Sequence, residues 1–156
     1  YLEITDKRMT RFNMTINQSI EMVDWAFKNS IGGEIFVPKT LSYKLPDLVK
    51  AICPKCKIKV TGIRPGEKLH EELVGISESE NTIETKNSFI ILQKFNKDIT
   101  KILIKKLKAK KVDSNFSYKS NNNKPAILYL GKHRKISDKI TINRNWHVYC
   151  LRQNTE

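Results

Sequence analysis

Long apolar runs and targeting segments are missing from this chain of 156 residues. Apolar stretches such as Phe89–Leu92 are far shorter than the ~20 residues that a membrane-spanning helix needs, so we predict no membrane segment. The first residues, Tyr1–Asp6, contain neither an initiator Met nor the basic and apolar regions of a secretory signal. We therefore expect a cytoplasmic protein and treat the chain as a fragment of a longer one.

Cysteine is also scarce, and three cysteines cannot all pair within one chain. Cys53 and Cys56 have the CxxC spacing of half a zinc site or of a redox dithiol. No second CxxC or closely spaced Cys/His pair completes a ligand set, since His133 and His147 are isolated. We interpret the pair as two incidental thiols and predict no metal site, with metal or redox chemistry as the less favoured alternative.

Acidic residues are few in the second half of the chain. Residues 1–85 hold 12 Lys and Arg against 12 Asp and Glu, whereas residues 86–156 hold 17 against 4 and so carry the whole net charge of +13. Such a basic half makes a small nucleic-acid-binding module the alternative function. Phe95 and Phe116 are widely separated, however, and a solvated basic helix accounts for the same lysines, so we rank nucleic acid second.

Glycine-rich phosphate cradles are absent from the sequence. It contains no GxGxxG, GxxGxxG or GxxxxGK[ST] pattern, and no Tyr is followed by Lys at the fourth position. We therefore expect no cofactor in this chain and no Tyr/Lys proton-transfer pair.

Apolar spacing and breaker residues predict the α/β or α+β class, of which we choose α/β. Thr15 and Gln18 form a capping box for a first helix. Asp98 can cap a basic amphipathic helix, whose expected apolar face is Ile99, Ile102, Leu103 and Leu107. In chain order the predicted elements are a helix at 15–29, a strand at 34–37, a helix at 45–52, a strand at 57–61, a short polar helix at 67–73, two strands at 82–85 and 88–92, and the basic helix from 98.

Composition divides the chain into three regions. Helices and strands alternate over 1–92, a basic helix and a polar, Asn-rich stretch follow to about 124, and isolated apolar runs among basic residues occupy 125–156. Ser114–Lys124 is polar and rich in Asn, and we expect it to be loop or disorder.

The segment Gly62–Glu71 is the most informative for chemistry. Pro65 and Gly66 fix a sharp turn after a predicted strand, which leaves Arg64 as an outward, two-pronged donor suited to phosphate. Glu67, three residues later, can accept hydrogen bonds from hydroxyls. A nucleotide sugar needs a cation to bind its diphosphate and a carboxylate to bind its ribose hydroxyls, and Arg64 and Glu67 supply this combination. A surface ion pair between Arg64 and Glu67 at a helix start explains the spacing equally well.

Three segments, Thr5–Phe12, Gly32–Lys39 and Gly62–Glu72, occur in an order and at spacings that closely resemble one family. The chain resembles the carboxyl-terminal part of the inverting UDP-N-acetylglucosamine 4,6-dehydratases. These are extended short-chain dehydrogenase/reductase enzymes of bacterial surface-polysaccharide and pseudaminic acid biosynthesis. The resemblance is strong to about Leu92 and ends at about Lys124. It implies a small substrate-binding lobe over 1–92, a basic helix with a family-like tail over 93–124 and a divergent basic tail at 125–156, with the Rossmann part largely missing.

By this resemblance, Arg64 is expected to contact the UDP diphosphate and Glu67 the uridine ribose. Arg11 and Thr10 are expected near the diphosphate or the sugar, and bracing of the loop before the first helix is the alternative role for Arg11. His70 and Glu71 also belong to the motif. Holding the predicted helix and touching the ligand are equally open roles for them.

The same resemblance implies NADP as cofactor of the complete enzyme, bound by a part that this chain lacks. The complete enzyme is expected to be a lyase that acts on UDP-N-acetylglucosamine or a related UDP-sugar, and a homo-oligomer of it is left open. Because neither a cofactor cradle nor a Tyr/Lys pair is encoded here, we expect the isolated chain to be inactive and to hold no catalytic residue.

Overall fold

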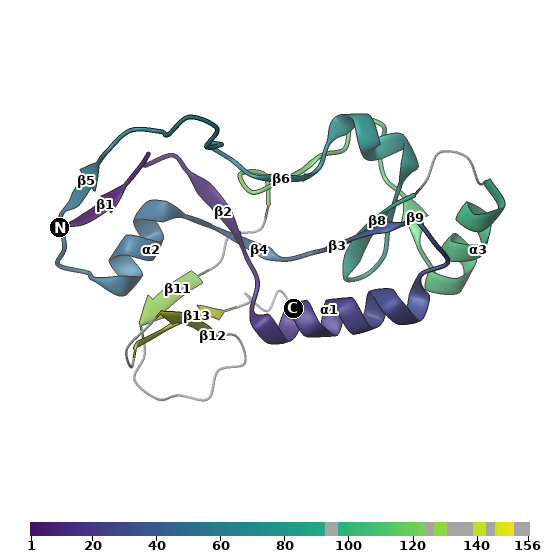
Figure 1. The fold of residues 1–156 in the computed structure, drawn as a ribbon, viewed down its shortest axis with the longest axis horizontal. Helices are drawn as coiled ribbons and strands as arrows, with labels where there is room; N and C mark the ends of the chain where they lie inside the picture. Colours follow the sequence, from purple (N-terminus) through teal and green to yellow (C-terminus); the bar gives the residue numbers. More distant parts are fainter. Residues whose placement is uncertain (93–96, 124–126, 131–138, 143–145, 152–156) are drawn as a thin grey trace. The chain divides into compact units, whose positions relative to one another are not determined.

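The computed structural model describes residues 1–92, 97–123, 127–130, 139–142 and 146–151 (Figure 1). The chain forms two compact units that alternate along the sequence. Unit 1 comprises Tyr1–Thr15, Thr40–Glu71 and Ser120–Glu156, and unit 2 comprises Ile16–Lys39 and Glu72–Lys119. Helices and strands are mixed in both units, which confirms the predicted class.

Unit 1 contains two pairs of short strands. Strand β1 (Leu2–Ile4) runs parallel to β5 (Ile58–Val60), and β2 (Thr10–Asn13) runs antiparallel to β4 (Leu41–Lys44). The predicted strand at 57–61 is thereby confirmed. Parallel pairing of β1 with β5 brings the carboxyl ends of both strands to one edge, where the segment after β5 begins.

Helix α2 (Leu45–Ile52) follows β4 directly and was predicted from its apolar stripe. Pro46 lies in the first turn, where its missing N–H leaves no helical bond unmade. Val49 and Ala51 are buried, and the helix contacts β1 and β4. The remaining strands of unit 1 form an antiparallel sheet of order β11-β13-β12: β11 (Ile127–Leu130), β12 (Lys139–Ile142) and β13 (Trp146–Leu151).

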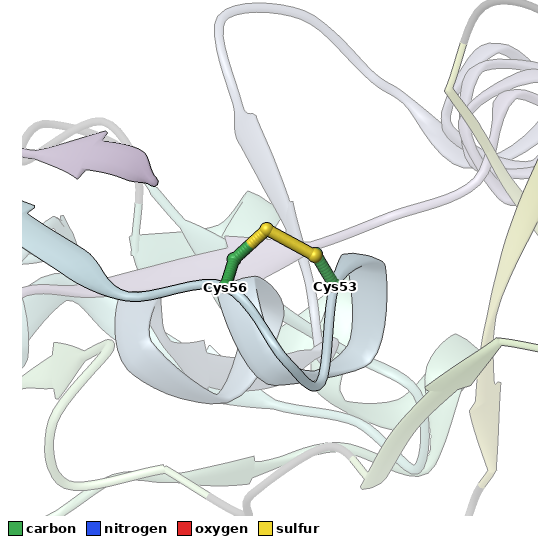
Figure 2. The surroundings of a disulfide bond; sticks show 2 residues. All are labelled: Cys53 and Cys56. Carbon is green, nitrogen blue, oxygen red and sulfur yellow. A yellow bond between two sulfur atoms is a disulfide. The ribbon is translucent and has the colours of Figure 1, made fainter.

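Helix α2 ends at a disulfide between Cys53 and Cys56 (Figure 2). Cys53 closes the last turn by donating its N–H to the carbonyl of Val49 (2.8 Å), and Cys56 donates to the carbonyl of Cys53 (3.0 Å). This turn brings the two Cα atoms to 5.3 Å, within the range for a disulfide. The interpretation of Cys53 and Cys56 as incidental thiols is therefore wrong. It rested on the incomplete set of metal ligands, which says nothing about the turn that brings the two cysteines together.

Unit 2 is built on an antiparallel sheet of order β3-β8-β7-β9. This unit also contains helix α1 (Ile16–Asn29) and helix α3 (Lys97–Leu107), both of which were predicted from the sequence. The hairpin at 82–92 is also confirmed. The strands are β3 (Ile35–Pro38), β7 (Thr82–Glu84), β8 (Ser88–Ile91) and β9 (Lys110–Lys111).

The core of unit 2 is a cluster of four buried side chains from the hairpin and α3: Ile83, Ile90, Leu92 and Leu103. Ile104 packs against this cluster, as do Ile99 and Leu107. Ile102 is 55% exposed, so the predicted apolar face of α3 is wrong at that one position. The helix turns Ile104 rather than Ile102 toward the core, and both are apolar, so the local pattern alone does not separate them.

Residues 67–73 do not form the predicted helix. Thr10 donates its N–H to the carbonyl of Leu69 (3.2 Å), and a parallel bridge joins Thr10 to His70. These contacts with β2, about sixty residues earlier in the chain, replace the local hydrogen bonds of a helix. Tertiary pairing therefore outweighs the local helical preference. Strand β6 (Glu72–Val74) follows, and then the 3₁₀ helix η1 (Ile76–Asn81).

The expectation of loop or disorder at 114–124 is wrong for the part that pairs. Strand β10 (Tyr118–Lys119) runs antiparallel to β6, and Phe89 packs against both Tyr118 (5.0 Å between ring centroids) and Phe116 (4.8 Å). In unit 1, Asn123 donates to the carbonyl of Thr40 (2.6 Å) and lies 2.8 Å from the Ser42 hydroxyl. The polar composition of this segment does not indicate which distant residues its side chains and backbone contact.

Candidate functional site

The candidate site lies on the segment that leaves β5. The β1–β5 ladder continues past the strand ends, because Thr61 donates to the carbonyl of Ile4 (2.9 Å) and Gly62 to that of Thr5 (3.1 Å). Gly62 has φ of 91° and Gly66 has φ of 80°, a region in which glycine is favoured. The ladder and these two glycines fix where the intervening loop turns outward.

Arg64 is exposed on this loop. Its backbone N–H donates to Oε2 of Glu67 (3.2 Å), and the N–H of Glu67 donates to the Arg64 carbonyl (3.0 Å). Within the described residues, the Arg64 guanidinium has no hydrogen-bond or ion-pair partner. The surface ion pair between Arg64 and Glu67, considered as the alternative from spacing, is therefore not formed, and the guanidinium is free to meet an anion.

The Glu67 carboxylate is held at the base of the loop. Its Oε1 lies 3.2 Å from the Thr5 hydroxyl and 3.6 Å from the Arg11 guanidinium, while Oε2 accepts from the Arg64 backbone. Its side chain keeps 26% exposure. A carboxylate has about four lone-pair sites, so Glu67 retains capacity for an outside hydroxyl.

Arg11 is engaged with its own chain. Its guanidinium donates to the carbonyls of Thr10 (2.7 Å) and Leu69 (3.3 Å), and it forms ion pairs with Glu67 (3.6 Å) and Glu71 (3.5 Å). It thus ties β2 to the segment 67–71. These bonds favour a structural role for Arg11 over direct contact with a ligand. The segment that Arg11 holds is 67–71, whereas the sequence suggested the loop before the first helix.

Thr10 is buried within a polar network. Its hydroxyl lies 2.8 Å from Nδ1 of His70 and 2.6 Å from the hydroxyl of Ser120, and Ser120 also accepts from the N–H of Glu71 (2.9 Å). Thr10 is 5% exposed and Ser120 is 2% exposed. His70 and Glu71 thus join Thr10 in holding the segment below Arg64.

Sequence reasoning missed Ser120. It lies 110 positions from Thr10 within an Asn-rich stretch, and no local pattern marks it. Only the fold brings it beside β2.

Asp6 and Arg8 close the turn that leads into β2. Arg8 donates to Asp6 through its backbone N–H (2.7 Å), Nε (3.1 Å) and Nη2 (2.8 Å). Hydrogen bonds from the Arg8 side chain and backbone lower the pKa of Asp6 from 3.8 to about 2, with a smaller contribution from the charge of His70. The turn therefore contains an ionised carboxylate over the whole ordinary pH range.

We expect Arg8→Ala to return the pKa of Asp6 toward 3.8, because the side-chain bonds that favour the charged form are removed. Since the folded pKa is the lower one, the pair stabilises the fold above pH 3.8, and that contribution is lost as the pH falls toward 2. A carboxyl-carbon NMR titration measures the pKa, and Lys7→Ala is the matched control. An unchanged Asp6 titration in Arg8→Ala would contradict this assignment.

The basic residues of unit 2 are mostly solvated or paired. Lys101, Lys105 and Lys106 are exposed on α3. Lys110 (3.1 Å) and Lys39 (2.7 Å) both pair with Glu84, and the hydrogen bond from Lys39 is the main reason that the pKa of Glu84 is lowered. Phe116 packs against Phe89, and Phe95 lies outside the described residues. These contacts favour the solvated basic helix, and nucleic-acid binding stays untested.

Glycine placement does not suit a dinucleotide in the described part of the chain. Gly32 and Gly33 have positive φ but lie between a helix and a strand, the reverse of the strand–glycine–helix order of a cofactor cradle. The loop with Gly62 and Gly66 leads into β6 and not into a helix. These residues therefore do not fit NADP.

Neither a metal cluster nor a membrane helix is found in the described ranges. No group of three or more His, Cys, Asp or Glu side chains converges there. None of the helices described is long and apolar enough to cross a membrane.

The fold defines a partial α/β lobe, and comparison with known proteins gives its family. Residues 1–93 match the family model described as polysaccharide biosynthesis protein. The chain belongs to this family.

Individual relatives agree with the resemblance seen in the sequence. The UDP-N-acetylglucosamine 4,6-dehydratase (inverting) of Campylobacter jejuni serotype O:2 is 41% identical over 126 residues, which cover 78% of this chain and 38% of that protein. The UDP-glucose 4-epimerase of Rickettsia akari is 40% identical over 77 residues, covering 47% of this chain and 23% of that protein. The predicted family resemblance is thus confirmed.

A solved structure agrees with the fold. The X-ray structure of Pen from Bacillus thuringiensis matches with a TM-score of 0.66 and 31% sequence identity. The match covers 79% of this chain and 37% of the Pen chain. The chain therefore spans less than half the length of these relatives.

Proposed function

We propose that this chain is the UDP-sugar-binding portion of a UDP-N-acetylglucosamine 4,6-dehydratase that acts in bacterial surface-polysaccharide biosynthesis. The observation that carries the proposal is the exposed Arg64 guanidinium, which has no partner among the described residues. A planar guanidinium offers parallel N–H groups that match paired diphosphate oxygens. The Campylobacter relative, named for UDP-N-acetylglucosamine, supports the choice of ligand.

Glu67 is the proposed contact for the uridine ribose. The Thr5 hydroxyl and the Arg11 guanidinium hold one carboxylate oxygen and the Arg64 backbone holds the other. Because these bonds fix the carboxylate before a ligand arrives, little conformational entropy is lost when a ribose hydroxyl donates to it.

Arg11 and Thr10 are proposed as positioning residues. The Arg11 guanidinium bonds the carbonyls of Thr10 and Leu69, and the Thr10 hydroxyl is buried against His70 and Ser120. Their role is to hold the backbone beneath Glu67, so that UDP meets a fixed surface.

Chemistry in the complete enzyme is proposed to use NADP, which supplies hydride transfer when bound. Because no cradle for it exists among the residues described here, we assign no catalytic residue to this chain and expect it to be inactive alone. Its contribution is to position the substrate, and positioning can be worth ~7–11 kcal/mol of a reaction barrier.

Nitrogen–proton NMR spectra of the chain, titrated with UDP and separately with uridine, test the proposal. UDP should shift the amides of residues 62–64, 66 and 67, and uridine should shift them much less because it lacks the diphosphate. Equal shifts with both ligands, or none in 62–67, would contradict the proposed site. Turnover of UDP-N-acetylglucosamine with NADP⁺ by a homogeneous sample would show that the expected inactivity is wrong.

A further inference from the structure

The disulfide between Cys53 and Cys56 lies outside the proposed UDP site, at a place that solvent reaches. The bond joins residues three positions apart at the end of α2 (Figure 2). Both cysteines are only half-buried, and Pro54 and Lys55 between them are exposed. Access of an attacking thiol is one condition for thiol–disulfide exchange, and this bond meets it.

The charges around the two sulfur atoms differ. Cys53 caps the carboxyl end of α2, where the negative end of the helix dipole opposes a thiolate. Cys56 stands between Lys55 and Lys57 in the sequence, and neighbouring cations stabilise a thiolate. Because a better-stabilised thiolate leaves faster, an attacking thiol should bond to Sγ of Cys53 and release Cys56.

We propose that Cys53 and Cys56 form a reversible redox pair whose disulfide holds the start of β5 in place. A dithiol reductant attacks Sγ of Cys53, breaks the sulfur–sulfur bond and leaves Cys56 as a thiolate. The second thiol of the reductant then displaces Cys53 from the mixed disulfide. Two electrons and two protons thus pass to the pair, and the dithiol becomes a disulfide. Oxidation by glutathione disulfide is the opposite exchange, in which the pair gives up two electrons and two protons and two glutathione thiols form.

The turn that the disulfide closes leads directly into the ladder of β1 and β5. The N–H of Leu2 donates to the carbonyl of Lys57 (2.9 Å), the residue after Cys56. The ladder ends where the N–H of Gly62 donates to the carbonyl of Thr5 (3.1 Å). Two paired strands of three residues each are marginal by themselves. Reduction removes the covalent restraint at the start of β5, so this ladder should open more often.

Counting free thiols tests the redox pair itself. The folded chain is equilibrated with mixtures of reduced and oxidised glutathione, quenched with acid and alkylated, and mass spectrometry counts the modified cysteines. The count should change reversibly between one and three, with the change at Cys53 and Cys56. Cys150→Ser should titrate at the same glutathione ratio, because Cys150 is not part of the pair. Free thiols at 53 and 56 at every ratio, or a disulfide that resists excess dithiothreitol in the folded chain, would overturn the proposal.

Replacement of the flanking lysines tests which sulfur leaves. The double variant Lys55→Gln, Lys57→Gln should be reduced by dithiothreitol roughly threefold more slowly, because the Cys56 thiolate loses its stabilising neighbours. Lys101→Gln with Lys105→Gln removes the same charge from the exposed side of α3 and is the matched control. An equal rate in the chain and the first double variant would show that Cys56 is not the favoured leaving group.

Hydrogen exchange tests the link between the pair and β5. The amides of Thr61 and Gly62 should exchange roughly 10-fold faster in the reduced chain than in the oxidised chain. The double variant Cys53→Ser, Cys56→Ser should match the reduced chain, and circular dichroism should show that it is folded. The amide of Leu92, which is bonded within unit 2, is the internal control. Equal exchange of Thr61 and Gly62 in both redox states would overturn the link, and none of these measurements depends on UDP binding.

Discussion

Arg64→Lys should weaken UDP binding nearly as much as Arg64→Ala. A guanidinium meets two diphosphate oxygens with parallel N–H groups, whereas an ammonium is a point charge and loses that geometry. A hydrogen bond to a charged group is worth ~1.5–3 kcal/mol, so each variant should lower affinity roughly 10- to 100-fold. The backbone bonds between Arg64 and Glu67 do not involve the replaced side chain, so the loop should keep its shape.

Chemical-shift titration of each variant with UDP measures this loss even where binding is weak. Lys105→Ala is the control, because it removes an exposed base of α3 and should change little beyond a background that salt screens. Wild-type affinity in Arg64→Lys would show that a point charge suffices and that the proposed diphosphate fork is wrong.

Local signals in the sequence predicted the elements whose bonds are local. Helix α1 follows from a cap at Thr15 and a stop at Gly32-Gly33, and the hairpin of β7 and β8 follows from two β-rich runs around a two-residue turn. Their hydrogen bonds join residues close in sequence, so the residues that specify them are visible in one short window.

Elements whose partners are distant could not be predicted in the same way. Residues 67–73 read as a helix, but Thr10 binds the backbone of Leu69 and the bridge to His70 keeps the segment extended. Strand β10 was not predicted either, because it lies in a polar stretch and pairs with the distant strand β6. Neither outcome has a local pattern, since the partner strand lies about sixty residues away for residues 67–73 and about 45 residues away for β10.

The candidate site shows the same division. Exposure of Arg64 follows from the Pro65–Gly66 turn, which the sequence displays. Arg11 is also a basic residue of a family-like motif, but the sequence cannot show that its guanidinium is already bonded. It donates to the carbonyls of Thr10 and Leu69 and pairs with two carboxylates. Which bases are free depends on how the fold distributes acceptors among them.

Ser120→Ala should loosen the support of the site more than any other change of a single hydroxyl described here. Ser120 is 2% exposed, lies 2.6 Å from the Thr10 hydroxyl and 3.2 Å from the Thr10 carbonyl, and accepts from the Glu71 N–H at 2.9 Å. Alanine fills nearly the same space but leaves the Glu71 N–H without its acceptor, whereas the Thr10 hydroxyl keeps His70 and the Thr10 carbonyl keeps Arg11. One unsatisfied buried group costs ~1–3 kcal/mol, so we expect a loss of about 2 kcal/mol.

Hydrogen exchange of the backbone amides measures that loss locally. The amides of Thr10 and Glu71 should exchange roughly 30-fold faster in Ser120→Ala, because their protection depends on the free energy of opening this network. Asn121→Ala is the matched control, since it changes the adjacent, exposed residue and should leave both amides protected. Unchanged exchange in Ser120→Ala would show that β2 and the segment 67–71 hold together without the hydroxyl, and that the tail adds nothing to the support of Arg64.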